Sequence, residues 1–555
     1  MTTDRRSLLQ ALAALGIGTD TFHRALAAQA PPKNAPARPT VTPEMVKAAE
    51  WVAGIELTDA QRSAVAGAMT RTLMGYAQLR AIDVPNEVAP AFAFIPDPSP
   101  AQSTPGKVTV ADTPTKKPAS DEDLAYLSIP QLGHLLRTKQ ISSVELTKFY
   151  LERLKKYGPP LLCVVSLTEE IALKQAKQAD EELAQGKIRG PLHGIPWGAK
   201  DLIAYPGAKT TWGAEHYKDQ VKSMKATVAE RLDQAGAVLV AKLTLGALAM
   251  GDEWFGGMTR NPWDVNQGSS GSSAGSASAV VAGLVPFAIG SETYGSIISP
   301  ATRCGATALR PTFGRVSRSG CMTLSWTLDK LGPFCRSVND CAIVLGVIHG
   351  ADPADIASVT RPFDWPSMKP LKDLRVGLAT GPGESKFEKE AEVLRKLGAN
   401  VMPIQLPKEI PLNPLLSILN AECAAAFDPI TRAGVDQGIG RWSTTFRQGE
   451  FVSAVEYLRA QRVRSLLIAK MSELMTKVNV YLSNSDLLLT NMTGHPTICM
   501  PNGLVNRADG KSTPLALTMT GRLFGETDLL HIAQAYQEAT GHHIPRPPLD
   551  KLTKA

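Results

Sequence analysis

The chain has 555 residues, of which 44% are hydrophobic and 20% charged, and its formal net charge is +7 at pH 7. These values are typical of a globular protein and exclude a collagen, a coiled coil or a largely disordered chain. The sequence has no block of five basic residues and no stretch near the roughly 18 apolar residues of a membrane span. We therefore expect no nucleic-acid partner and no stable membrane insertion.

The first thirty residues resemble an export signal. Arg5-Arg6 precedes a mildly apolar run that ends at Gly18, and residues 25–27 and 28–30 are small-x-small cleavage candidates. Asp4 and Asp20 depart from this pattern, so an ordinary amphipathic helix is the alternative. We expect a twin-arginine signal peptide over residues 1–30 and a periplasmic or exported product; without export the protein would be cytoplasmic.

Residues 31–120 are expected to form a linker and a helical extension. A Pro/Ala-rich segment precedes Pro43, which suits the first turn of a helix, and a second helical pattern runs from Leu57 to about Ile82. Residues 96–118 are rich in Pro, Ser and Thr, which is typical of a connector. The extension could cover a substrate cleft, join two copies in a homodimer, or form a packed surface layer, and the last role is favoured.

From residue 121 onward, short apolar runs alternate with helical patterns, which predicts an α/β fold with helices flanking a sheet. We assign residues 121–546 to one domain and residues 547–555 to a C-terminal tail. The expected strands are 237–241, 285–289, 375–378 and 498–500; the expected helices are 144–157, 172–185, 223–235, 387–397, 443–478 and 527–540.

Seven cysteines are present, and none belongs to a Cys-x-x-Cys pair. Their spacing supports neither a structural zinc site nor a dense disulfide framework, so we expect most of them to be small buried side chains. They are Cys163, Cys304, Cys321, Cys335, Cys341, Cys423 and Cys499.

A Ser/Gly-rich stretch at residues 267–278 runs directly into apolar, core-like sequence, which a flexible linker does not normally do. Downstream, Ser296 follows Gly295 in the run Gly290–Ser296, which places a serine after a series of backbone N–H groups and makes it a plausible nucleophile. The run does not match the Gly-x-Ser-x-Gly elbow. Upstream, Lys200 lies in an apolar segment, and burial can leave such a lysine uncharged and able to act as a base.

Taken together, these segments resemble the amidase signature family over roughly residues 121–546, about three quarters of the chain. The combination is more specific than any single Gly-rich motif. The matching segments are Gly194-Ile195-Pro196 with Lys200-Asp201, Asn261-Pro262-Trp263-Asp264, Ser272-Ser273-Ala274-Gly275-Ser276, Gly283-Leu284-Val285-Pro286, Gly295-Ser296-Ile297, residues 309–317, and Thr490–Pro496.

The resemblance implies a central mixed, twisted sheet covered by helices on both faces, and a Ser-Ser-Lys triad. Ser296 would be the nucleophile, Ser272 the proton relay after a cis peptide, and Lys200 the base. Ser269 is an alternative to Ser272, but the family spacing of 24 positions before Ser296 selects Ser272. The N–H groups of Thr293, Tyr294, Gly295 and Ser296 would bind the oxyanion. No metal or organic cofactor would be needed.

Four positions depart from the family pattern around the nucleophile. Glu292 stands in place of Asp, Tyr294 in place of Gly, and Ile298 in place of Arg, while Arg303 stands where an aromatic residue is usual. Tyr294 could narrow the pocket or require an unusual backbone angle, and Arg303 could restore the charge lost at position 298. His495, in a turn before an expected strand, is expected to be structural.

The favoured function is hydrolysis of a small-molecule, non-peptide amide through an acyl-enzyme, with ester hydrolysis as a close variant. One alternative is a protein like the A subunit of glutamyl-tRNA(Gln) amidotransferase, which the export signal and the N-terminal extension argue against. The other is a binding protein on a degenerate scaffold, an alternative motivated by Tyr294 and Ile298. The sequence does not identify the acyl group or the leaving amine.

Overall fold

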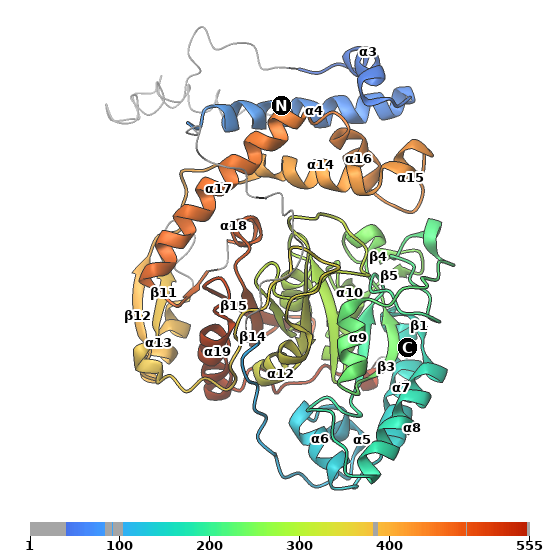
Figure 1. Cartoon of the computed structure of the whole chain (residues 1–555), viewed down its shortest axis with the longest axis vertical. Helices are drawn as coiled ribbons and strands as arrows, with labels where there is room; N and C mark the ends of the chain where they lie inside the picture. Colours follow the sequence, from blue (N-terminus) through green and yellow to red (C-terminus); the bar gives the residue numbers. More distant parts are fainter. Residues whose placement is uncertain (1–39, 84–91, 93–103, 381–386, 484–485, 552–555) are drawn as a thin grey trace.

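The computed structural model describes residues 40–83, 92, 104–380, 387–483 and 486–551 (Figure 1). Its centre is an 11-stranded mixed sheet in the order β1-β3-β2-β8-β10-β9-β14-β15-β13-β11-β12. The strands of this sheet are β1 (Val164–Leu167), β2 (Pro196–Lys200), β3 (Val238–Leu243), β8 (Phe287–Glu292), β9 (Thr307–Arg310), β10 (Lys330–Cys335), β11 (Arg375–Ala379), β12 (Asn400–Ile404), β13 (Val480–Leu482), β14 (Thr497–Asn506) and β15 (Ser512–Gly521).

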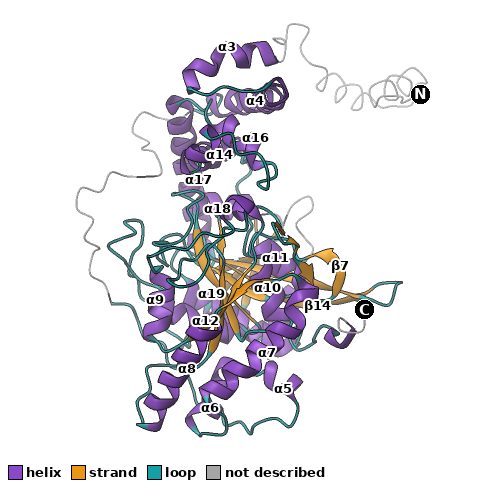
Figure 2. Ribbon diagram, turned by 90° about the vertical axis from the view of Figure 1, so that its right-hand side faces the viewer, coloured by secondary structure: helices purple, strands orange, loops and turns teal. Residues whose placement is uncertain are grey.

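Helices surround this sheet, and two small two-stranded sheets lie beside it (Figure 2). The small sheets pair β4 (Glu253–Trp254) with β5 (Gly257–Met258) and β6 (Arg260–Asn261) with β7 (Asp264–Gly268). The helices from residue 121 are α5 (Asp121–Ala125), α6 (Ile129–Arg137), α7 (Ser143–Leu161), α8 (Glu169–Ala184), α9 (Thr227–Gln234), α10 (Ala274–Val281), α11 (Ile298–Cys304), α12 (Val338–Ile348), α13 (Glu388–Lys396), α14 (Leu416–Ala426), α15 (Asp428–Arg432), α16 (Trp442–Gly449), α17 (Ala454–Lys477), α18 (Leu487–Thr493) and α19 (Glu526–Thr540). The short 3-10 helices are Glu215–Tyr217, Ala247–Ala249, Leu371–Asp373, Asn413–Leu415 and Leu549–Lys551.

Both faces of the central strands are buried, which explains their continuous apolar sequence. Successive side chains of a strand point to opposite faces, and on β3 Leu239 packs in one hydrophobic core while Val240 packs in another. The same alternation occurs on β8, where Phe287 and Ala288 belong to different cores. The mixed sheet between two helical layers confirms the expected α/β architecture.

The turn that carries Ser296 follows β8, an interior strand of this sheet with a neighbour on each side. β2 pairs with β8 in parallel, and β10 pairs with β8 antiparallel. Residues at the ends of these three strands therefore meet around the carboxyl end of β8, where residues 293–297 connect it to α11.

A separate helical layer lies at the top of the molecule in Figure 1. It is built from α3 (Pro43–Ala53) and α4 (Asp59–Arg80), in the region expected to be helical, together with α14, α15, α16 and α17. Leu79 of α4 packs in the hydrophobic core formed with α14 and α17. Gln448 on α16 donates a hydrogen bond to Thr72 on α4 over 2.6 Å. The extension is thus packed onto the helices between β12 and β13.

Several sequence expectations differ from the structure. The expected single helix over 443–478 is two helices, α16 and α17, with the break at residues 450–453. At the end of α16, a Cβ on Gly449 would lie 2.3 Å from the Asn420 carbonyl oxygen, so α16 approaches α14 closely there. Ser453 then caps α17 by accepting a hydrogen bond from the Glu456 N–H. The helical pattern of the sequence did not reveal this boundary, because the capping residue Ser453 lies in the middle of the segment.

The expected connector at 96–118 is not a free linker in its described part. The Thr109 N–H donates to the Trp365 carbonyl over 2.7 Å, and the Trp365 N–H donates to the Lys107 carbonyl over 2.9 Å. The expected signal peptide at residues 1–30 and most of the Pro/Ala-rich segment lie outside the described residues, as does the end of the tail. Across the residues described, no helix is both long and apolar enough to cross a bilayer. All seven cysteines are free thiols, and every one except the partly exposed Cys321 is buried.

Candidate active site

Lys200 is the last residue of β2, and its fully buried amine lies within a group of serine oxygens. Its Nζ is 2.8 Å from Ser272 Oγ, 3.0 Å from Ser273 Oγ and 2.9 Å from Ser291 Oγ. A fourth contact, at 3.3 Å, is with the Ser291 carbonyl oxygen. The carboxylate of the adjacent Asp201 forms an ion pair with Lys242 at 2.8 Å and not with Lys200.

This environment disfavours a charge on Lys200. Burial lowers the pKa of its amine from 10.5 to about 7, and the more distant Asp329 and Glu292 only partly oppose that effect. A large fraction of the lysine is therefore uncharged near neutral pH. An uncharged amine has a free electron pair and can accept a proton, as expected from the sequence for a catalytic base.

Ser272 reaches Lys200 from the turn that precedes α10. The peptide bond between Gly271 and Ser272 is cis. Ser269, the alternative position in the sequence, instead donates its hydroxyl to the Ser270 carbonyl over 2.9 Å. The structure thus brings Ser272, and not Ser269, to the buried amine.

Ser296 lies in the turn between β8 and α11, beside the Ser272 turn. The Ser273 N–H donates to the Ser296 carbonyl over 3.1 Å and fastens the two turns together. Ser296 is 8% exposed, and its hydroxyl forms no hydrogen bond with any residue that the structure describes. An unengaged hydroxyl at a partly accessible position is what a nucleophile requires.

The backbone of this turn presents free donors. Within the described chain, the N–H groups of all four expected oxyanion donors, Thr293, Tyr294, Gly295 and Ser296, have no hydrogen-bond acceptor. Gly295 has a φ of +89°, which favours glycine, and a Cβ there would lie 2.9 Å from Ser299 Oγ. Tyr294 is not among the described residues with positive φ, so the aromatic residue at this position needs no left-handed backbone. Four free N–H groups in one turn, the last of them that of Ser296 itself, can bind a developing oxyanion.

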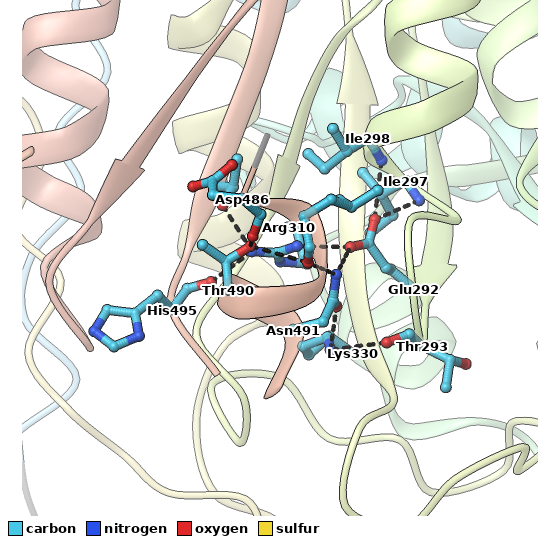
Figure 3. A network of polar contacts seen from close by, with 12 residues as sticks. Glu292, Thr293, Ile297, Ile298, Arg310, Lys330, Asp486, Thr490, Asn491 and His495 are labelled. Atoms are coloured by element: carbon cyan, nitrogen blue, oxygen red, sulfur yellow. Dashed lines mark hydrogen bonds and ion pairs between the residues drawn. The ribbon is translucent and has the colours of Figure 1, made fainter. Parts of the chain in front are cut away.

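Glu292 holds the far end of the turn in a buried polar network (Figure 3). One carboxylate oxygen accepts hydrogen bonds from the Ile297 and Ile298 N–H groups, at 2.8 and 2.9 Å. The other accepts from Arg310 and from Asn491, each at 2.7 Å. Despite burial, which raises it, the pKa of Glu292 is lowered to about 2, chiefly by Arg310 and then Lys330. The carboxylate that replaces the family aspartate is therefore ionised and fully hydrogen-bonded.

Asp329 and His495 hold the surroundings of the turn. Asp329, half-buried just before β10, accepts a hydrogen bond from the Thr293 hydroxyl over 2.6 Å, and removal of its carboxyl from water raises the pKa of that group. The carbonyl of His495 accepts a hydrogen bond from Arg310 over 2.9 Å, and its ring lies 2.8 Å from Thr493 Oγ1. This agrees with a structural role for His495.

Two cavities border the residues before and after Ser296. One, of about 200 Å³, is lined by Ser291, Thr293, Cys321, Met322, Trp326 and Asp329 among others. The other, of about 630 Å³, is lined by Ser270, Ile298, Ser299, Thr302, Arg303 and Leu487 among others. Arg303 thus borders the same cavity as Ile298, where the sequence suggested that it could restore a charge. Its Nε donates a long hydrogen bond of 3.4 Å to the Gly268 carbonyl.

Three further residues belong to the site without having been expected there: Ser273 and Ser291, which contact Lys200, and Asp329, which contacts Thr293. The sequence could have indicated Ser273, because it belongs to the same Ser-Ser pair as Ser272. Ser291 and Asp329 gave no such signal, since their proximity to Lys200 and Thr293 depends on the pairing of β8 with β2 and β10.

The chain is similar in sequence to a known protein family and to characterised relatives. The sequence model of the amidase family matches residues 145–500. The A subunit of glutamyl-tRNA(Gln) amidotransferase from Coxiella burnetii is 33% identical over 486 residues, covering 76% of this chain and 99% of that protein. Its counterpart from Carboxydothermus hydrogenoformans is 32% identical over 490 residues, covering 77% of this chain and 100% of that protein.

Solved structures are similar over the same share of the chain. Native peptide amidase from Stenotrophomonas maltophilia superposes with a TM-score of 0.66 at 28% identity, covering 76% of this chain and 98% of that one. An amidase family protein from Bacillus anthracis gives a TM-score of 0.68 at 25% identity, with coverage of 77% and 93%. The similarity thus extends over nearly the whole length of these proteins and leaves about a quarter of this chain unmatched.

Proposed function

The chain belongs to the amidase signature family, and from this premise we propose that it hydrolyses carboxylic amides through an acyl-enzyme on Ser296. The observation that carries the proposal is the buried Lys200 amine at 2.8 Å from Ser272 Oγ, with its pKa lowered to about 7. A base of that pKa is half uncharged near neutral pH, which suits general base catalysis.

In the proposed acylation step, uncharged Lys200 takes the hydroxyl proton of Ser272, and Ser272 takes the proton of Ser296. Ser296 Oγ then forms a bond with the amide carbonyl carbon, and the carbonyl oxygen becomes an oxyanion. The free N–H groups of Thr293, Tyr294, Gly295 and Ser296 would bind that oxyanion, and each such donor is worth roughly 3–4 kcal/mol where measured. Collapse of the intermediate breaks the C–N bond, and the amine leaves with a proton delivered through Ser272.

Deacylation follows the same path with water in place of Ser296. Lys200 and Ser272 take one proton from the water, the hydroxide attacks the ester carbonyl, and Ser296 regains its proton as the carboxylic acid leaves. The proposed substrate is a small amide, with its two substituents entering the cavities on either side of the turn. No step requires a metal ion or an organic cofactor.

The proposal is tested by labelling with a fluorophosphonate probe, which reacts only with an activated serine. Intact mass and peptide mapping should show one adduct on Ser296, and the Ser296→Ala variant should show none. A panel of primary amides, anilides and esters would then define the substrate. A folded wild-type protein that forms no adduct would contradict the proposal and favour the binding-protein alternative, in which Tyr294 blocks the turn.

A second candidate is transamidation as one component of a larger enzyme, which the similarity to amidotransferase A subunits favours. Such a protein would hydrolyse glutamine and pass the ammonia to a partner protein. Copurification from the native host tests this idea: stable partners, with amide hydrolysis only in their presence, would support it over the hydrolase proposal.

We also propose that the protein is exported through the twin-arginine sequence at its N-terminus. The basis is Arg5-Arg6 and the apolar run that follows, which lie outside the described residues. We likewise propose that two copies of the chain form a homodimer, which sedimentation of the purified protein would test.

A further inference from the structure

Two buried lysines flank the end of β8, one on each neighbouring strand. Lys200 ends β2, and Lys330 begins β10, where it lies opposite Glu292 in the strand register. Lys330 is 2% exposed, and it forms no ion pair with any carboxylate in the described part of the chain. The proposed mechanism uses Lys200 and leaves the second buried amine without a role.

The direction of the Lys330 amine is set by Asn491 (Figure 3). Asn491 Nδ2 donates to Glu292 over 2.7 Å and to the Leu487 carbonyl over 2.8 Å. Its side-chain oxygen therefore faces the other way, and it accepts a hydrogen bond from Lys330 Nζ over 2.7 Å. A second hydrogen of the same amine points to the Thr293 carbonyl oxygen, which is 3.4 Å from Nζ.

This contact fixes the orientation of one peptide group of the nucleophile turn. The Thr293 carbonyl and the Tyr294 N–H belong to the same peptide, which is not among the cis bonds of the structure. In a trans peptide the C=O and N–H bonds point in opposite directions. Because Lys330 holds the carbonyl on its own side, the Tyr294 N–H is directed away from Lys330. Glu292 fixes the other end of the turn through the N–H groups of Ile297 and Ile298.

We infer that Lys330 is a positioning residue for the proposed oxyanion hole: held by Asn491, it binds the Thr293 carbonyl and so aims the Tyr294 N–H at the oxyanion. The inference rests on the proposed function, because it needs an oxyanion to form at Ser296. Lys330 touches neither substrate nor nucleophile in this scheme and acts only through the backbone. A lysine that merely fills a buried position would affect stability without changing the rate at a properly folded site.

The experiment compares the second-order rate constant for phosphonylation of Ser296 in wild type and in K330M. The phosphonyl oxygen of the adduct occupies the same hole as a substrate oxyanion, so the rate reports on the N–H groups. Removing an oxyanion donor outright costs about 100-fold or more, so misdirecting one should slow K330M by about tenfold or more. The KM for an amide substrate should stay within about twofold, since the effect arises in the transition state.

Arg231→Met is the matched control, because Arg231 also donates to backbone carbonyls, those of Ile348, Gly350 and Ala351, none of which belongs to the turn of Ser296. R231M should react at the wild-type rate even if it melts earlier. K330R, which keeps side-chain N–H donors at this position, should recover part of the loss. If K330M does not fold, K330Q replaces it, since glutamine can still donate to Asn491 but is one atom shorter than lysine.

The outcomes separate this inference from the proposed function. If wild-type protein forms no Ser296 adduct, the proposed function fails and the role of Lys330 fails with it. If wild type reacts and a folded K330M or K330Q reacts at the same rate, the inference alone is overturned. If the rate falls while KM stays constant and K330R recovers activity, the inference holds.

Discussion

Lys200 Nζ lies 2.8 Å from Ser272 Oγ although 72 positions separate the two residues. One ends a buried parallel strand, and the other follows the cis peptide before α10. The contact is buried, and Lys200 forms no ion pair with a carboxylate of the described residues, so burial governs the pKa of the amine. The pair therefore places an amine that is partly uncharged near neutral pH against a hydroxyl.

The rate of acylation should rise with pH through about pH 7. The base is the uncharged amine, and its fraction grows as pH passes the lowered pKa of Lys200, about 7. The check is the pH profile of Ser296 phosphonylation between pH 5.5 and 9. In Lys200→Met we expect the rise of the rate with pH to disappear and the rate to fall by about 100-fold or more. A flat wild-type profile over this range would show that Lys200 is not the titrating base.

Ser272→Ala should lower kcat/KM by about 100- to 10,000-fold, the usual contribution of positioned proton transfer. Ser269→Ala is the matched control, since Ser269 is equally buried but its hydroxyl donates to the Ser270 carbonyl and not to Lys200, and it should retain near-wild-type activity. Ser273→Ala removes one hydrogen-bond partner of Lys200 and should cost about tenfold. Equal losses in S269A and S272A would contradict the assigned relay.

Glu292→Gln should destabilise the fold, because it leaves the buried Arg310 guanidinium without its carboxylate. Breaking a buried ion pair from one side costs about 3–5 kcal/mol. Urea unfolding at pH 7 measures the free-energy difference, and the double variant E292Q/R310M should lose less than the sum of the single variants. Additive losses would mean that the two side chains contribute independently of each other.

Tyr294→Gly should widen access to Ser296 without a large loss of stability. The ring is 42% exposed, so little buried surface is lost when it is removed. We expect the ratio of labelling rates for a bulky over a small fluorophosphonate to increase severalfold, and Tyr294→Phe should leave the ratio unchanged. An unchanged ratio in Y294G would show that the ring does not limit the approach of substrate.

Replacing Arg5-Arg6 by Lys-Lys should abolish export of a reporter fused after residue 43. The twin-arginine pair is the element that an export machinery of this kind reads, and the substitution conserves charge. Periplasmic and cytoplasmic fractions are compared for both sequences in a bacterial host. Export of the Lys-Lys fusion at the same level would favour an ordinary N-terminal helix.

The spacing known for the amidase signature family was enough to select Ser272 as the expected bridging serine. Counting 24 positions back from Ser296 gives Ser272, and in the structure Ser272 contacts Lys200 while Ser269 does not. The α/β architecture was equally accessible, since apolar runs such as Val238–Leu243 and Phe287–Glu292 alternate with helical patterns. The break between α16 and α17 was not, because the close approach of Gly449 to α14 is a contact between distant segments.

What the sequence by itself determined is therefore the set of reactive residue types, their spacing, and the alternation of strands and helices, all of which are local or repeat a family pattern. Only the tertiary structure decided the electrostatics of the site. The lowered pKa of Lys200 depends on complete removal of its amine from water, which requires β2, β3 and β8 to be packed on both faces. The contact of Lys330 with Thr293 likewise depends on the pairing of β10 with β8 and on the amide orientation of Asn491. Burial and strand register are properties of the whole fold, because they arise from segments that lie far apart in the sequence.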